Sequence, residues 1–360
     1  MLLRRIAVIF VCCIIGGPYV VSGQTYFNKT YEFDTLTEFG NGVIVNDSSY
    51  IIATDVTYQR TPDTATGKAG LMKVGLNGNV QWKSQLENSA FSATGPIDPL
   101  LRTHDSHYLV FGSTTRHRNR QARLFKFNRQ GDTVWTAMVG GKDRDWFQNG
   151  VQLGDSTIYA TGVTESVNGT EDFWLVKFNR HGKLLWQRAY GGPKLDERPF
   201  SLTIAQDGGL VMTGRTDLGV GTKKNGLVVK VDTAGNWLWE RRRGGTQATA
   251  FHHTLPYNSR YLLSIGVQSE NGWRNTSNGI VTKMNLKGEV VDEYIYSEDK
   301  EYMQLRKGTP VMADSTVVVA GELQVGRDGL HKVMLMKINP ATGEKERLNS
   351  FYHKNPYPLA

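Results

Sequence analysis

The chain of 360 residues contains only two cysteines, Cys12 and Cys13, and no hydrophobic run long enough to span a membrane. Its most apolar segment, residues 6–21, has 16 residues and is interrupted by Gly and Pro, whereas a spanning helix needs about 20. Arg4 and Arg5 precede this segment, and small residues follow it. We therefore expect residues 1–23 to be a signal peptide. Residues 24–360 would form a single mature domain without a membrane span, exported to the periplasm, the cell surface or the medium.

Both cysteines fall within the predicted signal peptide, so the mature chain has none. This excludes disulfides, a thiolate nucleophile and cysteine-bound metal from the mature protein. Without Arg4 and Arg5, the 42 basic residues fall to 40 against 34 acidic ones, a formal net charge of +6. Such a charge favours anionic partners such as acidic polysaccharide. We expect a monomer that does not bind nucleic acid, because the chain is exported and has no basic helix.

The chain also lacks the motifs of several enzyme and metal-binding classes. It has no Gly-x-Ser-x-Gly elbow, no His-Glu-x-x-His pair, no phosphate-binding P-loop and no EF-hand spacing. We therefore predict neither a cofactor nor a metal site, and calcium held between loop carboxylates stays an open alternative.

What the chain does contain is a repeat. Six similar segments each carry a lysine, and consecutive lysines stand 51 to 54 residues apart: Lys73, Lys126, Lys177, Lys230, Lys283 and Lys337. Each repeat has four strand-like stretches separated by turn signals, as in residues 150–153, 157–163, 173–179 and 183–190. Four short strands per repeat are typical of a propeller blade. We predict an all-β fold, a six-bladed β-propeller with four antiparallel strands per blade.

The two ends of the chain leave one alternative open. Residues 27–31 resemble residues 186–190 at the end of the third repeat, so the chain begins with a spare fourth strand. The last repeat has its own fourth strand near residues 347–352. Either strand could form the outer edge of the last blade, and a seven-bladed propeller would result if both ends built an extra blade.

The pattern Lys-x-Asn/Asp-x-x-Gly-x-x-x-Trp occurs at residues 126–135, 177–186 and 230–239. With the Gly-Gly pairs that follow, it resembles the repeats of secreted Bacteroidetes-type β-propeller proteins, which are distantly similar to quinoprotein (PQQ-like) repeats. The resemblance implies the fold but does not carry over the quinone cofactor. That cofactor needs an eight-bladed channel and charged ligands, which this chain does not show.

The repeated tryptophans and lysines have structural interpretations. We expect Trp82, Trp135, Trp186 and Trp239 to pack between adjacent blades. In the last two repeats Asp292 and Arg347 stand near the tryptophan position, which predicts looser packing there. We expect the six lysines to bond to carbonyls or to a carboxylate in a turn.

Antiparallel order places the tight turns on one face of the blades, the turn face, and the variable loops on the other, the loop face. Variable loops on a rigid scaffold usually carry binding residues. The basic and aromatic side chains of these loops are the predicted binding residues: Arg116, His117, Arg118, Trp146, Lys223, Lys224, Trp273 and Arg274. They favour a non-catalytic module that recognises an anionic glycan or a partner protein.

The loop face also carries groups that could be catalytic. Asp145 and Asp196 both stand five residues after the first Gly of a Gly-Gly pair, Glu197 follows, and Thr249 occupies the equivalent place later. Paired carboxylates could act as acid and base of a glycoside hydrolase. His252 or His253 could act as a base in a uronate lyase. A polysaccharide-degrading enzyme using Asp145, Asp196, Glu197, His252 and His253 is therefore the alternative to a binding module.

Overall fold

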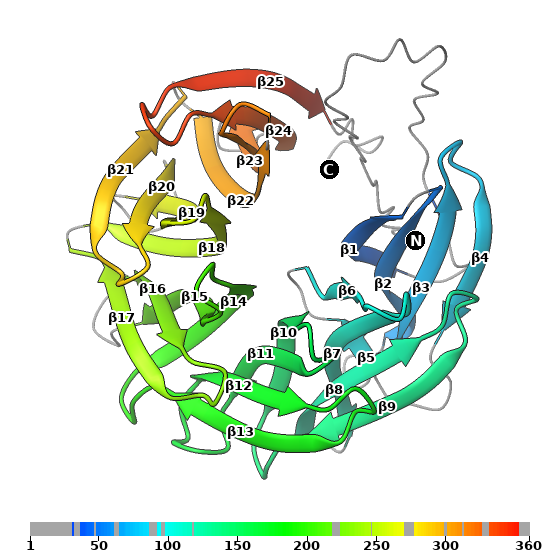
Figure 1. The fold of residues 1–360 in the computed structure, drawn as a ribbon. Helices are drawn as coiled ribbons and strands as arrows, with labels where there is room; N and C mark the ends of the chain where they lie inside the picture. The colour runs from blue at the N-terminus through cyan, green and yellow to red at the C-terminus, as the bar shows by residue number, and fades with distance from the viewer. Residues whose placement is uncertain are drawn as a thin grey trace. The chain divides into compact units, whose positions relative to one another are not determined.

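The computed structural model describes residues 31, 37–46, 48–60, 65–85, 92–94, 98–116, 119–217, 224–245, 247–269, 277–298, 301–311, 313–325 and 331–352. Throughout these residues the regular structure is β-strand, without helix, and no segment could span a membrane as a long apolar helix. The strands of each sheet follow one another in chain order and pair antiparallel (Figure 1).

The strands form six sheets, numbered 1 to 6 along the chain. Sheet 1 consists of β1 (Thr37–Asn46), β2 (Ser49–Arg60), β3 (Ala65–Gly75) and β4 (Val80–Gln85). Sheet 2 consists of β5 (Ser92–Thr94), β6 (Leu100–Arg102), β7 (Tyr108–Arg116), β8 (Asn119–Phe127) and β9 (Thr133–Val139). Sheet 3 consists of β10 (Asp145–Gln152), β11 (Ile158–Thr164), β12 (Asp172–Phe178) and β13 (Leu184–Tyr190).

Sheet 4 consists of β14 (Asp196–Ile204), β15 (Leu210–Asp217), β16 (Lys224–Val231) and β17 (Trp237–Arg243). Sheet 5 consists of β18 (Ala248–Tyr257), β19 (Tyr261–Ser269), β20 (Asn278–Asn285) and β21 (Val290–Tyr296). Sheet 6 consists of β22 (Glu301–Val311), β23 (Thr316–Val325), β24 (His331–Ile338) and β25 (Lys345–Tyr352).

In sheet 2, β5 and β6 both pair with β7, so they are two halves of one interrupted first strand. Each sheet is thus a blade of four antiparallel strands, and the predicted six-bladed β-propeller fold is confirmed. The outer strand of sheet 6 is β25, which pairs with β24. Of the two candidate strands for the outer edge of the last blade, the last repeat's own fourth strand therefore occupies it.

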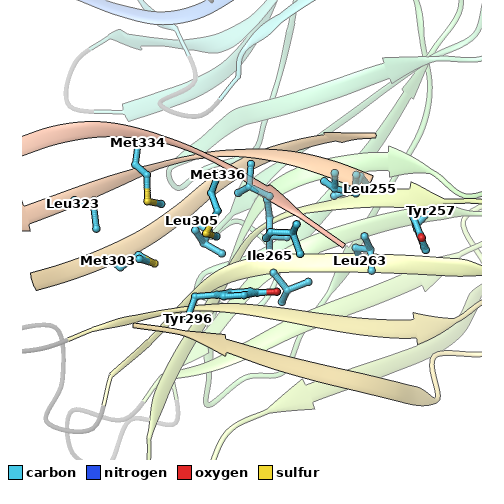
Figure 2. Close-up of a cluster of buried hydrophobic side chains, with 14 residues drawn as sticks. Leu255, Tyr257, Leu263, Ile265, Tyr296, Met303, Leu305, Leu323, Met334 and Met336 are labelled. Carbon is cyan, nitrogen blue, oxygen red and sulfur yellow. The ribbon is translucent and has the colours of Figure 1, made fainter. Parts of the chain in front are cut away.

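The residues gather into two compact units. Unit 1 comprises residues 1–169 and 174–190, and unit 2 comprises residues 170–173 and 191–360. In unit 2, a cluster of buried side chains lies between strands of sheets 5 and 6, including Ile265, Leu305 and Met336 (Figure 2). In unit 1, Phe111, Phe147 and Trp174 form a comparable core between sheets 2 and 3. Alternating apolar residues thus bury one face of a sheet against its neighbour.

Three of the four repeated tryptophans pack against the next repeat as predicted, whereas the ring contact described for Trp186 is with Tyr159 of its own sheet. Trp82, Trp135 and Trp239 each lie against the turn glycine of the next repeat, which is Gly131, Gly182 and Gly288 respectively. In each case a side chain at the glycine would collide with the indole ring. The positive φ of these glycines also disfavours any other residue.

The fifth repeat corrects the expectation of looser packing. Asp292 does occupy the tryptophan position in the register, opposite Lys283. Tyr294, two residues later on the same face, packs its ring against Gly343 instead. The aromatic contact with the next repeat is therefore kept. The side chain of Arg347 lies outside the described residues.

Of the predicted N-terminal strand, the structure describes only Tyr31. Its hydroxyl donates a 3.0 Å hydrogen bond to the carbonyl of Gly78 in sheet 1. Tyr296 makes the same bond to Gly343, also 47 residues later. Tyr31 therefore occupies the place of Tyr296, a fourth-strand position that precedes the first repeat. This register is the one that the sequence suggests, because Tyr190 and Tyr296 both stand 13 residues after the lysine of their repeat.

Candidate functional site

The first strands of five of the six sheets share a β-bulge at one register, and in sheet 2 the first strand is interrupted instead. The register shifts between Gly40 and Gly42 in β1, and the bulges of β10, β14, β18 and β22 follow the same pattern. The extra residues are Asn41, Gln148, Phe200, His252 and Arg306. A bulge kinks its strand and redirects a side chain, and bulges are enriched next to functional sites. The structure therefore sets one position in each of these five sheets apart from the ordinary ladder.

Glycines of the second strands make room for these bulges. Added side chains at Gly162, Gly214 and Gly266 would collide with the carbonyl oxygens of Trp146, Arg198 and Ala250. None of these three glycines has a positive φ, so close approach of the backbone is the reason for their small size. The repeated glycine of the second strand therefore belongs to the bulge.

Three of the bulge residues lie together in unit 2. The rings of Phe200 and His252 have centroids 5.6 Å apart. Nδ1 of His252 lies 2.7 Å from the carbonyl oxygen of Leu305, which can only accept, so Nδ1 carries the proton. Nε2 then accepts from Nη1 of Arg306 at 3.3 Å. His252 thus holds the guanidinium of Arg306 at a defined place.

The environment of His252 keeps it neutral. Burial, reinforced by the positive charge of Arg306, lowers the pKa of His252 to about 3. A base with such a pKa has little affinity for a proton at neutral pH. His253, the neighbouring candidate, points elsewhere, and its Nδ1 accepts a long 3.5 Å hydrogen bond from the amide of Gly308. His252 and His253 are thus better suited to holding neighbouring groups in place, such as the guanidinium of Arg306, than to transferring a proton.

Two arginines face each other on the adjoining strands. Arg198 in β14 lies directly opposite Arg215 in β15. Arg198 forms a bidentate ion pair with the carboxylate of Glu171. The guanidinium carbon of Arg215 lies 5.7 Å from the centroid of the Phe200 ring. Burial and the charge of Arg198 lower the pKa of Arg215.

The candidate carboxylates Asp145 and Glu197 are buried and hold loops in place. Oδ2 of Asp145 accepts hydrogen bonds from the amide of Gly141 at 2.8 Å and from Oγ of Ser166 at 2.9 Å. Oε2 of Glu197 accepts from the amide of Gly192 at 3.4 Å. Both side chains are fully buried.

The structure also corrects the alignment of Asp145 with Asp196 that the glycine pairs suggest. Asp145, Glu197 and Thr249 each stand three residues before the bulge and pair with Thr164, Thr216 and Gln268. The equivalent of Asp145 is therefore Glu197, and the loop before β14 is one residue longer than the glycine count suggests. Asp196 is exposed, and its Oδ1 accepts from the amide of Glu171 at 3.1 Å.

Glu197 has the most perturbed carboxyl group of this region. Burial raises its pKa to about 7, although Arg242, whose Nη2 lies 3.4 Å from Oε1, acts in the opposite direction. The neighbouring Asp172 adds to the rise. A carboxyl group with a pKa near neutrality could act as a general acid, but full burial separates this one from any polysaccharide chain.

The predicted basic loop residues are only partly described. Lys224 begins β16, and its Nζ lies 3.6 Å from Oδ2 of Asp217. Trp146 is 6% exposed, and the guanidinium carbon of Arg120 lies 4.6 Å from its ring centroid. Arg116 ends β7, where its backbone pairs with Asn119. The remaining predicted binding residues lie outside the described residues: His117, Arg118, Lys223, Trp273 and Arg274.

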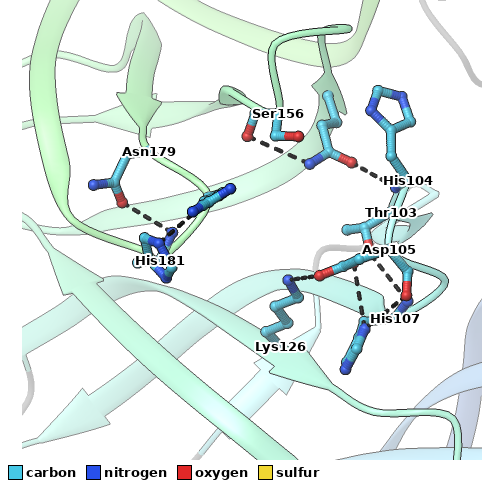
Figure 3. Close-up of polar contacts among 10 residues, drawn as sticks. Thr103, His104, Asp105, His107, Lys126, Ser156, Asn179 and His181 are labelled. Atoms are coloured by element: carbon cyan, nitrogen blue, oxygen red, sulfur yellow. Dashed lines mark hydrogen bonds and ion pairs between the residues drawn. The ribbon is translucent and has the colours of Figure 1, made fainter.

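On the turn face, charges are paired in the second, fourth and sixth repeats. Nζ of Lys126 lies 2.6 Å from Oδ2 of Asp105, which also accepts from Thr103 (Figure 3). Burial alone would raise the pKa of Asp105, but these hydrogen bonds lower it well below its usual range. Lys230 and Lys337 each lie 2.5 Å from the equivalent turn carboxylates, Asp207 and Asp314. The predicted structural role of these lysines is confirmed. In the described part of the chain, no group of three or more His, Cys, Asp or Glu could hold a metal ion.

No protein-family model matches this sequence, and none of the curated proteins compared with it matches either. Solved structures do share its architecture. An ulvan lyase that represents a new polysaccharide lyase family matches with a TM-score of 0.57 and 10% identity, over 86% of this chain and 82% of its own. An α-L-arabinofuranosidase from Fusarium graminearum matches with a TM-score of 0.50 and 8% identity, over 84% and 92% of the two chains. A protein of unknown function from Dyadobacter fermentans matches with a TM-score of 0.49 and 12% identity, over 81% and 92%.

At these identities the similarity shows the fold alone, because one propeller fold serves many functions. The fold agrees with the coarser part of the resemblance seen in the sequence. The likeness to quinoprotein repeats and the export of the chain stay predictions.

Proposed function

We propose that this protein is an exported, non-catalytic binding module that recognises an acidic polysaccharide through its loop face. The observation that carries the proposal is the arginine pair near the loop ends of β14 and β15. Arg198 and Arg215 stand directly opposite each other, and like charges at such positions destabilise a sheet. An anionic ligand would offset that cost.

The contrast between the two faces supports the same conclusion. On the turn face, cations such as Lys126 and Lys230 are already neutralised by turn carboxylates. On the loop face, Arg215 makes no hydrogen bond or ion pair with any described residue, although it is half-buried. Asp217 and Glu171 act favourably on its charge, but burial and Arg198 outweigh them, and a cation in this situation is suited to an incoming anion.

The second candidate function is polysaccharide degradation. The names of two structures that share the fold describe enzymes that act on saccharides, an ulvan lyase and an arabinofuranosidase. In this chain, however, the proposed acid Glu197 is fully buried, and the proposed base His252 has a pKa of about 3. These properties favour binding over catalysis.

The test is a panel of polysaccharides with the exported protein. We expect retention on a uronate or sulfated polysaccharide column, elution by added NaCl, and no retention on a neutral dextran column. Exposed charges interact over a Debye length of about 8 Å at physiological ionic strength, so elution by salt is expected. Release of reducing ends or of unsaturated uronate would support the enzyme instead. Absence of retention on every acidic polysaccharide would reject the proposed ligand, and capture of a protein from the cell envelope in that case would favour a partner protein.

A further inference from the structure

The side chains around the bulges of sheets 4, 5 and 6 form one connected group within unit 2. Arg215 lies over Phe200, Phe200 lies beside His252, and His252 accepts from Arg306. Arg198 in β14 adjoins the group as the direct cross-strand partner of Arg215 in β15. We call these five residues the arginine cluster.

The charges of the arginine cluster do not balance. Glu171 is paired with Arg198, and Nε of Arg306 lies 3.3 Å from Oε1 of Glu322. His252 adds no charge, because burial and Arg306 keep its pKa low. The remaining cation is Arg215, which has no ion-pair partner among the described residues; the nearby Asp217 lies 3.6 Å from Lys224. The cluster therefore has room for one negative charge.

The cluster is also accessible. The side chain of Arg198 is 42% exposed and that of Arg306 is 40% exposed, whereas Glu171 is only 8% exposed. Both side chains thus reach solvent, while a buried carboxylate holds Nε and Nη2 of Arg198 from behind. Guanidinium groups bind planar or tetrahedral oxyanions through two parallel hydrogen bonds.

We propose that the arginine cluster is a binding site for a single oxyanion group, the carboxylate or sulfate ester of an acidic saccharide. Arg215 supplies the uncompensated charge, Arg198 supplies a second guanidinium across the ladder, and His252 positions Arg306. This assignment rests on the proposed function for the saccharide, but not for the oxyanion itself.

The first arm of the test uses small probes, sodium sulfate and sodium glucuronate, with NaCl at equal ionic strength as the control. Anion binding to the folded protein raises its unfolding temperature in proportion to the logarithm of ligand concentration. We expect sulfate or glucuronate to stabilise the protein where NaCl does not. A response to glucuronate alone assigns a carboxylate, and a response to sulfate alone assigns a sulfate ester. An equal response to all three salts overturns the site.

The second arm uses variants. Arg215→Gln should weaken binding of the effective probe about 10- to 100-fold, as expected for loss of a charge-assisted hydrogen bond. Because the substitution also removes a like-charged pair, the variant should unfold at or above the temperature of the parent in the absence of the probe. Arg198→Lys keeps a cation for Glu171 but loses the planar fork, and should weaken binding as well. Arg260→Gln removes an exposed cation from the turn between β18 and β19 and should leave binding unchanged.

The outcomes separate the site from the proposed function. If Arg215→Gln and Arg198→Lys bind sulfate and glucuronate like the parent, the arginine cluster is not the site. If the variants lose the small probe but the parent never binds acidic polysaccharide, the oxyanion site stands and the polysaccharide function fails. If both variants lose the small probe but keep polysaccharide binding, the oxyanion site stands and its assignment to the saccharide is wrong.

Discussion

Asp292 accepts a 2.8 Å hydrogen bond from Nζ of Lys283, and it does so from the position that tryptophan occupies in four other repeats. In the second, fourth and sixth repeats the corresponding lysine pairs with a carboxylate in the turn after the first strand. The fifth repeat has Asn258 in that turn. In the fifth repeat the carboxylate that pairs with the buried ammonium therefore comes from the fourth strand, and not from the turn after the first strand.

This relationship predicts the effect of removing Asp292. Asp292→Ala would leave Lys283, which is 8% exposed, without its carboxylate, and should lower the free energy of unfolding by about 1 to 2 kcal/mol. Asp132→Ala, in the exposed turn of sheet 2, is a control for loss of one carboxylate and should cost less. Urea denaturation measures both. Equal stability of Asp292→Ala and the parent would mean that Lys283 finds its partner elsewhere.

Glu197 should make stability depend on pH. Its pKa of about 7 in the folded protein lies above the ordinary value of 4.5, so the folded state binds the proton more tightly. The group therefore adds stability as pH falls through about 7, and this gain is complete below about 4.5.

Glu197→Gln replaces the titrating carboxyl with a neutral amide of the same shape. We expect the variant to be more stable than the parent by about 2 kcal/mol at pH 8.5, and the difference to vanish near pH 4.5. Thermal unfolding at several pH values measures this. A constant difference between the two proteins across that range would show that Glu197 does not change its protonation state there.

Truncation of two tryptophans of β17 should lower the free energy of unfolding by very different amounts. Trp239 is 9% exposed, packs on Gly288 and donates a 2.9 Å hydrogen bond from Nε1 to the carbonyl of Leu286. Trp239→Ala should cost about 3 to 5 kcal/mol, through lost burial and a residual cavity. Trp237, two residues earlier, is 56% exposed, and Trp237→Ala should change stability by less than about 0.5 kcal/mol. The pair is compared by chemical denaturation, and similar losses in both variants would contradict the packing described for Trp239.

The bulge of β14 should make Gly214 intolerant of substitution. A methyl group at Gly214 would collide with the carbonyl oxygen of Arg198, so Gly214→Ala should destabilise the protein by about 1 to 3 kcal/mol. Gly154 has open space around the equivalent atom and no positive φ. Gly154→Ala should therefore be neutral or stabilising by about 0.4 to 1 kcal/mol, because alanine restricts the unfolded chain. A tolerant Gly214→Ala would show that the bulge relaxes without cost.

The sequence by itself determined the repeat and the strands of each blade, favoured six blades over seven, and predicted that the repeated lysines bond to carbonyls or to a turn carboxylate. These features are local: a lysine such as Lys230 and a turn residue such as Asp207 recur at nearly constant spacing, and strand alternation sets which side chains share a face. Only the tertiary structure decided where the bulges lie, because the position of an extra residue depends on how the strand pairs with its neighbour. The same register brought Arg198 opposite Arg215, aligned Asp145 with Glu197, and placed Asp292 beside Lys283. The candidate site depends on these long-range alignments, so it could not be found by counting residues along the chain.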